Sequence, residues 1–182
     1  ALGIVVRFGE QPPSFRPVHF QVQTPETGRF GGVFALSPSG RMMAFVAMVA
    51  DEPQLWVHSF ETGQSRPLLN AGSVSNAMFW SPDSRFLAFP IEGKLKKISV
   101  VGEQVQTVCD LPPGSTYGGG AWNAQNVIVF GGSAGLMQVP AEGGVATPVT
   151  VLDRSRGDMG HPGPRFLPDG RHFLYSALPA KN

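Results

Sequence analysis

Cysteine and charged residues are both scarce in this sequence of 182 residues. The single cysteine, Cys109, excludes a disulfide within the chain and a metal site built from several thiolates. Lys and Arg number 14 against 13 Asp and Glu, so the formal net charge is only +1, and no basic stripe stands out. We therefore expect no nucleic-acid partner, because such binding depends on neutralising many phosphates.

Long hydrophobic runs and helical patterns are also missing. No apolar run reaches the roughly 20 residues of a membrane-spanning helix, and no segment keeps a helical spacing of apolar residues between caps. The first residues, ALGIVVRFGEQPP (1–13), are mostly apolar up to an Arg and a Pro pair. We expect residues 1–17 to form an N-terminal segment. Two interpretations stay open: the end of a membrane helix followed by a linker, or a buried strand or tag remnant.

Glycine and proline are abundant instead, with 23 and 17 residues, and they are spaced as turns rather than clustered. A turn with proline recurs at 37–41 (SPSGR), 81–85 (SPDSR) and 167–171 (LPDGR), each time before an apolar run. A further unit, AWNAQNVIVF (121–130), has one residue fewer and no proline, so its hairpin is expected to differ in type. The units recur every 42 to 44 residues, a period typical of arrays whose units cannot bury their faces alone.

Each unit divides into four short strands rich in Val, Phe, Leu and Ile. In the second unit they are expected at 77–80, 86–89, 94–100 and 104–109, separated by turns. The runs FLAF (86–89) and VIVF (127–130) are apolar at consecutive positions, so both faces of these strands need a neighbouring sheet. Two-sided burial argues against an ordinary sandwich. The pattern predicts an all-β fold, a β-propeller of four-stranded antiparallel blades.

The turn units also resemble a known family. LSPSGRMMAF, WSPDSRFLAF and FLPDGRHFLY resemble the TolB-type, WD40-like propeller repeat, and the resemblance covers roughly residues 30–178. The stretches VHFQVQTPETGRFGG (18–32) and GHPGPRFLPDGRHFLY (160–175) are further similar to the extracytoplasmic propellers of bacterial membrane-spanning serine/threonine kinases. No kinase motif is present in the sequence.

This resemblance implies a non-enzymatic module that binds a ligand or another protein. Such a module would be the sensor-like extracytoplasmic part, periplasmic or at the cell surface, of a larger bacterial protein anchored in the inner membrane. An alternative stays open: the propeller portion of a prolyl-oligopeptidase-like hydrolase. In those enzymes the repeats look similar, and the catalytic residues lie on a separate domain that this sequence lacks.

The number of units predicts a partial ring of about three and a half blades. Residues 18–182 are assigned to the propeller, with blades at about 33–70, 77–110 and 119–151 and a half blade at 164–178. The strand VHFQV (18–22) is expected to supply an outer strand. Because an open ring leaves unpaired strand edges and an apolar blade face, we expect a piece of a larger propeller that forms a homodimer to complete the ring.

One stretch satisfies a hydrolase pattern. GGSAG (131–135) has the Gly-x-Ser-x-Gly form, and Asp153, Asp158 and His161 follow in hydrolase order. The pattern has its catalytic meaning only on a strand-to-helix elbow, whereas here a strand precedes the serine and another strand follows it. We interpret Ser133 as part of a turn and expect no catalytic residue. A serine esterase acting through Ser133 remains a further alternative.

Two other groups of residues are interpreted as structural. The glycines of STYGGGAW (115–122) suit the close approach of an innermost strand to the crowded axis better than an anion site, since no helix follows. His161 and His172 lie near Asp158 and Asp169 in the sequence, but Asp169 already has a role in its turn. We expect no metal and no cofactor.

A ligand site is expected at the loops that lead into the innermost strands. Ligands of propellers tend to bind there, because loops vary while the sheets hold them rigidly. Counting back from the strand before each turn, Ser75, Tyr117 and His161 occupy equivalent places. The predicted ligand-binding residues are Arg29, Ser75, Asn76, Tyr117, Asp158 and His161. In a ring they would converge on one face.

Overall fold

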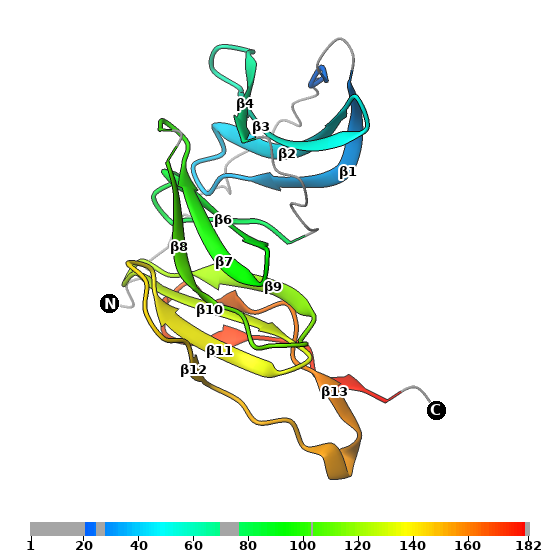
Figure 1. Cartoon of the computed structure of the whole chain (residues 1–182). Helices are drawn as coiled ribbons and strands as arrows, with labels where there is room; N and C mark the ends of the chain where they lie inside the picture. Colours follow the sequence, from blue (N-terminus) through cyan, green and yellow to red (C-terminus); the bar gives the residue numbers. More distant parts are fainter. Residues whose placement is uncertain (1–20, 25–27, 70–76, 103, 181–182) are drawn as a thin grey trace, which may run out of the picture.

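Figure 1 shows a computed structural model of the chain, which describes residues 21–24, 28–69, 77–102 and 104–180. The predicted N-terminal segment (1–17) lies outside these residues. Of the predicted leading strand (18–22), only Gln21 and Val22 are described, and neither lies in a strand. No helix within the described ranges has the length and apolarity that a bilayer crossing requires.

Three four-stranded antiparallel sheets form the body of the molecule. Blade 1 consists of β1 (Gly28–Leu36), β2 (Met42–Val49), β3 (Glu52–Ser59) and β4 (Ser65–Leu69). Blade 2 consists of β5 (Phe79–Trp80), β6 (Phe86–Ile91), β7 (Lys94–Ser99) and β8 (Val105–Asp110). Blade 3 consists of β9 (Tyr117–Trp122), β10 (Val127–Gly132), β11 (Gly135–Pro140) and β12 (Thr147–Pro148). In each blade, strands adjacent in the sequence are adjacent in the sheet, so every blade is a meander.

A half-blade follows blade 3, in which β14 (Arg165–Phe166) pairs with β15 (Phe173–Leu174). The connection to it contains a short 3-10 helix, η1 (Arg154–Arg156), and β13 (Asp158–Gly160), which pairs with β16 (Leu178–Pro179). The first strands β1, β5, β9 and β14 are neighbours in that order. The described part of the chain contains no α-helix. The prediction of an all-β, partial β-propeller of about three and a half blades is confirmed.

The turn between the first two strands is built in the same way in three units, and its left-handed fourth residue recurs in all four. In blade 2, Ser81 N–H donates to the carbonyl of Phe86 at 2.9 Å, and the Ser81 hydroxyl accepts the N–H of Phe86 at 2.9 Å. The fourth turn residue has a positive φ in all four units: Gly40 69°, Ser84 61°, Asn126 59° and Gly170 68°. This left-handed position favours glycine or asparagine, which explains why a Gly or polar residue recurs there.

The unit at 121–130 keeps this turn with one residue fewer. Asn123 N–H donates to the carbonyl of Val127 at 3.0 Å, and Asn123 Oδ1 accepts the N–H of Val127 at 2.8 Å. The side-chain oxygen of Asn123 therefore accepts the backbone N–H that the Ser81 hydroxyl accepts in blade 2. The hairpin differs in length, while the side-chain oxygen that caps it is retained.

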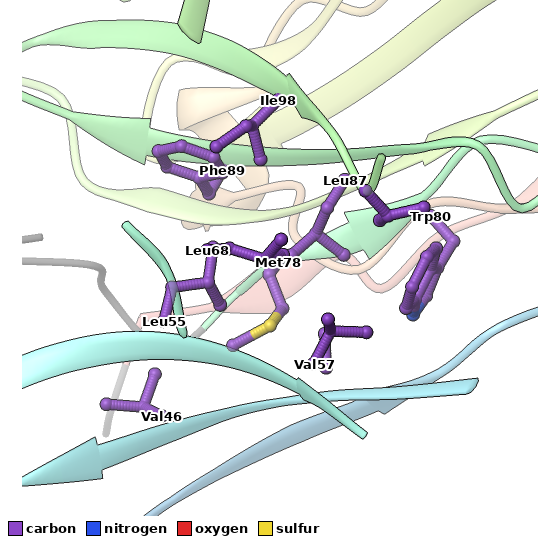
Figure 2. Packing of buried hydrophobic residues seen from close by; sticks show 11 residues of the cluster. Val46, Leu55, Val57, Leu68, Met78, Trp80, Leu87, Phe89 and Ile98 are labelled. Atoms are coloured by element: carbon purple, nitrogen blue, oxygen red, sulfur yellow. The ribbon is translucent and has the colours of Figure 1, made fainter. Parts of the chain in front are cut away.

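The hydrophobic core lies between successive blades. Figure 2 shows the core that blades 1 and 2 share, with Val46, Leu55, Val57 and Leu68 on one side and Met78, Trp80, Leu87, Phe89 and Ile98 on the other. On the opposite face of β6, Ala88 belongs to a second core shared with blade 3. The strand β6 is therefore buried on both faces, as its run of apolar residues predicts.

Hydrogen bonds between residues about one repeat apart also join the blades. The indole N–H of Trp80 in blade 2 donates to the carbonyl of Ala35 in blade 1 at 2.9 Å. At the junction between blade 3 and the half-blade, Asn123 Nδ2 donates to the carbonyl of Gly170 at 2.9 Å. Because both acceptors are backbone carbonyls, these bonds fix the position of one sheet relative to the next.

Glycines allow the innermost strands to approach closely. A Cβ atom at Gly118 would lie 2.5 Å from Cβ of Pro162, and one at Gly120 would lie 2.5 Å from the ring of Phe79. Both distances are far below van der Waals contact, so a larger residue would push neighbouring blades apart. The glycines of 115–122 therefore have the structural role expected from the sequence.

Substituting Gly132 tests a further close approach, within blade 3, between the end of β10 and the residue before β9. A Cβ atom at Gly132 would overlap the backbone carbonyl oxygen of Thr116, which cannot rotate away. We expect Gly132→Ala to lower the free energy of unfolding by about 3 kcal/mol, as overpacking of a dense interior does. The matched control is Gly102→Ala, because the nearest atom to a Cβ there is 3.8 Å away. Urea denaturation followed by circular dichroism measures both, and equal stability of the two variants would contradict the prediction.

Candidate functional site

Two of the predicted site residues, Tyr117 and His161, lie next to Gly132 at the end of β10. Tyr117 is the first residue of β9 and pairs opposite Gly132 at the end of β10. His161 follows β13, and its backbone N–H donates to the carbonyl of Gly132 at 2.9 Å. Counting positions along the repeat therefore places Tyr117 and His161 correctly near each other. Ser75 and Asn76 lie outside the described residues.

Arg29 lies in β1 of blade 1, two blades away from Tyr117. Its guanidinium forms an ion pair with Asp51 at 3.6 Å, and both side chains are largely exposed. Exposed pairs of this kind contribute little to stability. That these loops bind a ligand stays a prediction.

His161 is buried at the junction between blade 3 and the half-blade. Its Nδ1 lies 2.7 Å from the hydroxyl of Thr150, and its Nε2 lies 3.5 Å from Oδ2 of Asp158. The Thr150 oxygen already accepts the N–H of Leu136 at 2.9 Å. The contacts are satisfied together when Thr150 donates to Nδ1 and the Nε2–H is directed to Asp158. His161 thus connects β11, the loop after blade 3 and β13.

The hydroxyl of Tyr117 is buried and has no hydrogen-bond partner among the described residues. Its ring is stacked on Phe130, with ring centroids 6.3 Å apart. Burial, and to a lesser extent the nearby Cys109, raises the pKa of the Tyr117 phenol, so the group stays neutral. Burial likewise raises the pKa of the Cys109 thiol to about 11, with a further contribution from Asp110. Neither group is therefore activated as a nucleophile at neutral pH.

Ser133 lies in the tight turn between β10 and β11, where Gly132 pairs with Gly135. Its hydroxyl oxygen accepts the N–H of Thr116 at 2.9 Å. The interpretation of the GGSAG stretch as a turn between two antiparallel strands is therefore confirmed. The imidazole of His161 is directed to Thr150 and Asp158.

The aspartate of the last turn acts as a cap. Asp169 Oδ1 accepts the N–H groups of Arg171 and His172, and Oδ2 lies 2.6 Å from Nδ1 of His172. These hydrogen bonds, the one from the His172 side chain above all, lower the pKa of Asp169 to about 2. Within the described ranges, no three His, Cys, Asp or Glu side chains gather in a way that suits a metal ion.

Blade 1 has an exposed apolar surface, which we call the open face. The sequence analysis expected an apolar blade face where the ring is open, but it did not say which residues form it. Phe34 and Leu36 of β1 are 59% and 55% exposed there, and Phe30 lies beside them. The open face contains a hollow of about 350 Å³. It is lined by Val22, Thr24, Phe30, Phe34, Leu36, Met43 and Phe45. Aligning the strand register of blade 1 with that of blade 2 is the sequence signal that could have revealed this surface.

A second surface, which we call the arginine cleft, lies between blades 1 and 2. Its volume is about 760 Å³. Arg41, Arg66 and Arg85 line it from two blades. They are 25 and 19 residues apart in the sequence, so no local pattern joins them.

Comparisons with known proteins support the fold. No protein-family model and no curated protein matches the sequence. Among solved structures, TolB from Acinetobacter baumannii has a TM-score of 0.66 at 14% identity, covering 82% of this chain and 38% of that chain. A putative TolB from Agrobacterium tumefaciens has a TM-score of 0.58 at 16% identity, covering 79% and 57%. An oligogalacturonate lyase from Vibrio parahaemolyticus has a TM-score of 0.59 at 14% identity, covering 78% and 44%.

These likenesses show the fold, a TolB-like β-propeller, as the turn motifs predicted. The chain spans between 38% and 57% of the length of the three structures it resembles. Proteins with this fold include an enzyme and the TolB proteins.

Removing the hydroxyl of Tyr117 tests whether the group is unsatisfied. We expect Tyr117→Phe to raise the free energy of unfolding by about 1 kcal/mol, because a buried hydroxyl without a partner costs desolvation energy. Tyr175→Phe is the control, since Tyr175 is partly exposed and should change stability by less than about 0.5 kcal/mol. Urea denaturation measures both. A loss of stability in Tyr117→Phe would show that the hydroxyl has a partner.

Proposed function

We propose that this chain is a non-enzymatic protein-interaction or ligand-binding propeller module that pairs with a second copy of itself to complete its ring. The observation that carries the proposal is the open face of blade 1. This face repeats the positions that in blades 2 and 3 pack against the preceding blade.

The strand register makes the repetition explicit. The residue before the turn is Leu36 in blade 1, Trp80 in blade 2 and Trp122 in blade 3. The residue opposite it on the second strand is Met43, Leu87 and Ile128, respectively. Side chains directly opposite in an antiparallel pair lie on the same face of the sheet. Each blade therefore has an equivalent apolar face on the side of the preceding blade.

The equivalent positions differ in their burial. Trp80 is 6% exposed because blade 1 covers it, and Leu87 is fully buried. In blade 3, Ile128 is fully buried against blade 2 and Trp122 is partly buried there. Leu36, at the position of Trp80, is 55% exposed, since none of the described residues forms a blade on that side. An exposed apolar surface of this kind is typical of an interface.

The other end of the stack is also open. Leu174 in the half-blade is 63% exposed and lies at the position that Ala88 occupies, fully buried, in blade 2. Among the described residues, β15 pairs only with β14, so its outer edge is unpaired. Unpaired edges are templates for further strand pairing. Blade 1 therefore exposes the face that a preceding blade would cover. The half-blade exposes the face that a following blade would cover.

A second copy fits both ends at once. Under a two-fold axis, the open face of each copy meets the half-blade of the other, so the interface repeats and closes. Two copies together contribute six full blades and two half-blades, within the roughly four to eight blades of closed propellers. The formal net charge of +1 adds little repulsion between copies.

The proposed setting is the sensor-like extracytoplasmic part of a larger bacterial protein anchored in the inner membrane. Its support is the resemblance of residues 18–32 and 160–175 to the propellers of membrane-spanning kinases. The TolB-like fold is compatible with this setting. One of the solved neighbours is a lyase, so the absence of catalysis is part of the proposal and does not follow from the fold.

Analytical ultracentrifugation of the purified chain tests the second copy. We expect the wild-type chain to sediment at twice its mass of 19.4 kDa at about 10 μM, a concentration at which a Kd of about 1 μM gives mostly dimer. Phe34→Asp, which adds a charge to the open face, should sediment as a monomer with an unchanged circular dichroism spectrum. Val145→Asp is the control, because Val145 is exposed in the loop before β12 and lies outside the open face.

Three results would overturn the second copy as the occupant of the open face. They are a wild-type monomer at about 100 μM, far above that Kd, a Phe34→Asp variant that remains dimeric, and assemblies that grow beyond two copies. In each case a different segment or partner would have to cover the face.

An esterase assay tests the absence of catalysis. Because the Ser133 hydroxyl accepts a backbone N–H and Tyr117 and Cys109 stay protonated, we expect no hydrolysis of p-nitrophenyl acetate above that of heat-denatured protein. Ser133→Ala should give the same background rate. Turnover that disappears in a folded Ser133→Ala variant would instead establish a serine esterase.

A further inference from the structure

The arginine cleft lies between blades 1 and 2, on the side where the recurring turns are found. Its walls include the β1–β2 turn with Ser39 and Arg41, the β3–β4 turn with Glu61, and the β5–β6 turn with Asp83 and Arg85. The volume of about 760 Å³ falls in the range of pockets that bind small molecules. Because both walls belong to one copy, the cleft does not depend on the proposed dimer.

The first two arginines are held at the cleft by different contacts. Arg66, in β4 of blade 1, donates a guanidinium N–H to the carbonyl of Val100 in blade 2, which fixes the guanidinium at the junction of the blades. Arg41 pairs with Glu61 at 3.3 Å, and both side chains are mostly exposed. An exposed pair of this kind is weak, so an anionic ligand can compete with Glu61 for Arg41.

The third arginine, Arg85, has guanidinium N–H groups that are not hydrogen bonded to described residues. Among the described residues, the guanidinium of Arg85 makes no hydrogen bond and no ion pair within 4 Å. The nearby Asp83 is engaged in its own turn, where its Oδ1 accepts the N–H of Arg85 and the hydroxyl of Ser81. These hydrogen bonds and the charge of Arg85 outweigh the effect of burial and lower the pKa of Asp83. The guanidinium of Arg85 therefore keeps its donors available to a ligand.

The junction between blades 2 and 3 offers an internal comparison. A cleft of about 660 Å³ lies there, and Arg85 and Gln106 fill the positions that Arg41 and Arg66 have in blade 1. The shorter turn of blade 3 has no residue at the position of Arg85. Its other cation, Lys97, donates to the carbonyl of Ala141 at 2.7 Å. Three arginines thus meet at the first junction, whereas the second has one arginine and one lysine that is already hydrogen bonded.

We propose that the arginine cleft binds a small organic anion through Arg41, Arg66 and Arg85. Guanidinium groups present planar pairs of donors that match carboxylate and phosphate oxygens, and such charge-assisted hydrogen bonds are among the strongest in proteins. Hydroxyl groups of Ser59, Thr62 and Ser65 also line the cleft and suit the neutral polar part of such a molecule. Met42 and Val57 also line the cleft and suit a carbon skeleton.

Isothermal titration calorimetry of the full chain in phosphate-free buffer at low salt tests the proposal. The probes are citrate for carboxylate, inorganic phosphate for phosphate, and glucose as a neutral compound. We expect citrate or phosphate to bind and glucose not to bind. Arg85→Gln should weaken the binding about tenfold or more. The reason is that a charge-assisted hydrogen bond contributes more than about 1.4 kcal/mol, the free energy that corresponds to a tenfold change in Kd. The stronger of the two anions identifies the chemical group that the cleft prefers.

Two controls separate a specific site from general attraction of anions. Arg156→Gln, which removes an arginine in η1 outside the cleft, should bind as the wild type does. Phe34→Asp should also bind normally, because the open face is a separate surface, so failure of the dimer leaves this result intact. No binding of either anion at 10 mM, about the weakest affinity that the titration resolves, overturns the proposal. So does an Arg85→Gln variant that binds normally, or an Arg156→Gln variant that is weakened equally.

Discussion

The need to cover both faces of a thin sheet governs this structure. In β6, Leu87 contacts the core shared with blade 1 while its neighbour Ala88 contacts the core shared with blade 3. Burial of apolar surface is the main favourable contribution to folding, and no single four-stranded sheet can obtain it alone. The hydrogen bonds between repeats, such as that from Trp80 to the Ala35 carbonyl, add a fixed alignment to this stacking. The stability of each blade therefore depends on the presence of its neighbour.

Much of the fold follows from local sequence patterns, whereas the residues that form the candidate surfaces do not. The turn at 81–85 is local: a side-chain oxygen on Ser81 and a left-handed fourth residue suffice to form it. Counting along the repeat assigned Tyr117 and His161 to equivalent positions, and in the structure both lie next to Gly132. It could not reveal that His161 is directed to Thr150, because this contact depends on how the loop after blade 3 returns to the sheet.

The open face and the arginine cleft arise from different levels of structure. The open face is a property of a single sheet, and its apolar side chains are already visible once blade 1 is aligned with blade 2. The arginine cleft arises only when two sheets stack, because turns of both blades line it. Blade 1 contributes to both surfaces, through opposite faces. A molecule bound in the cleft would contact the sheet whose other side is proposed to meet the second copy.

Contacts in this stack run between adjacent sheets: β1 with β5, β5 with β9, and β9 with β14. Blade 2 has a full sheet on each side, whereas detaching blade 1 or the half-blade breaks a single junction. Within a single copy, opening at either end therefore breaks fewer junctions than opening at blade 2. In this way the alternation of thin sheets and shared cores makes the middle of a single copy, with the fully buried Phe89 and Ile98, the hardest part to open.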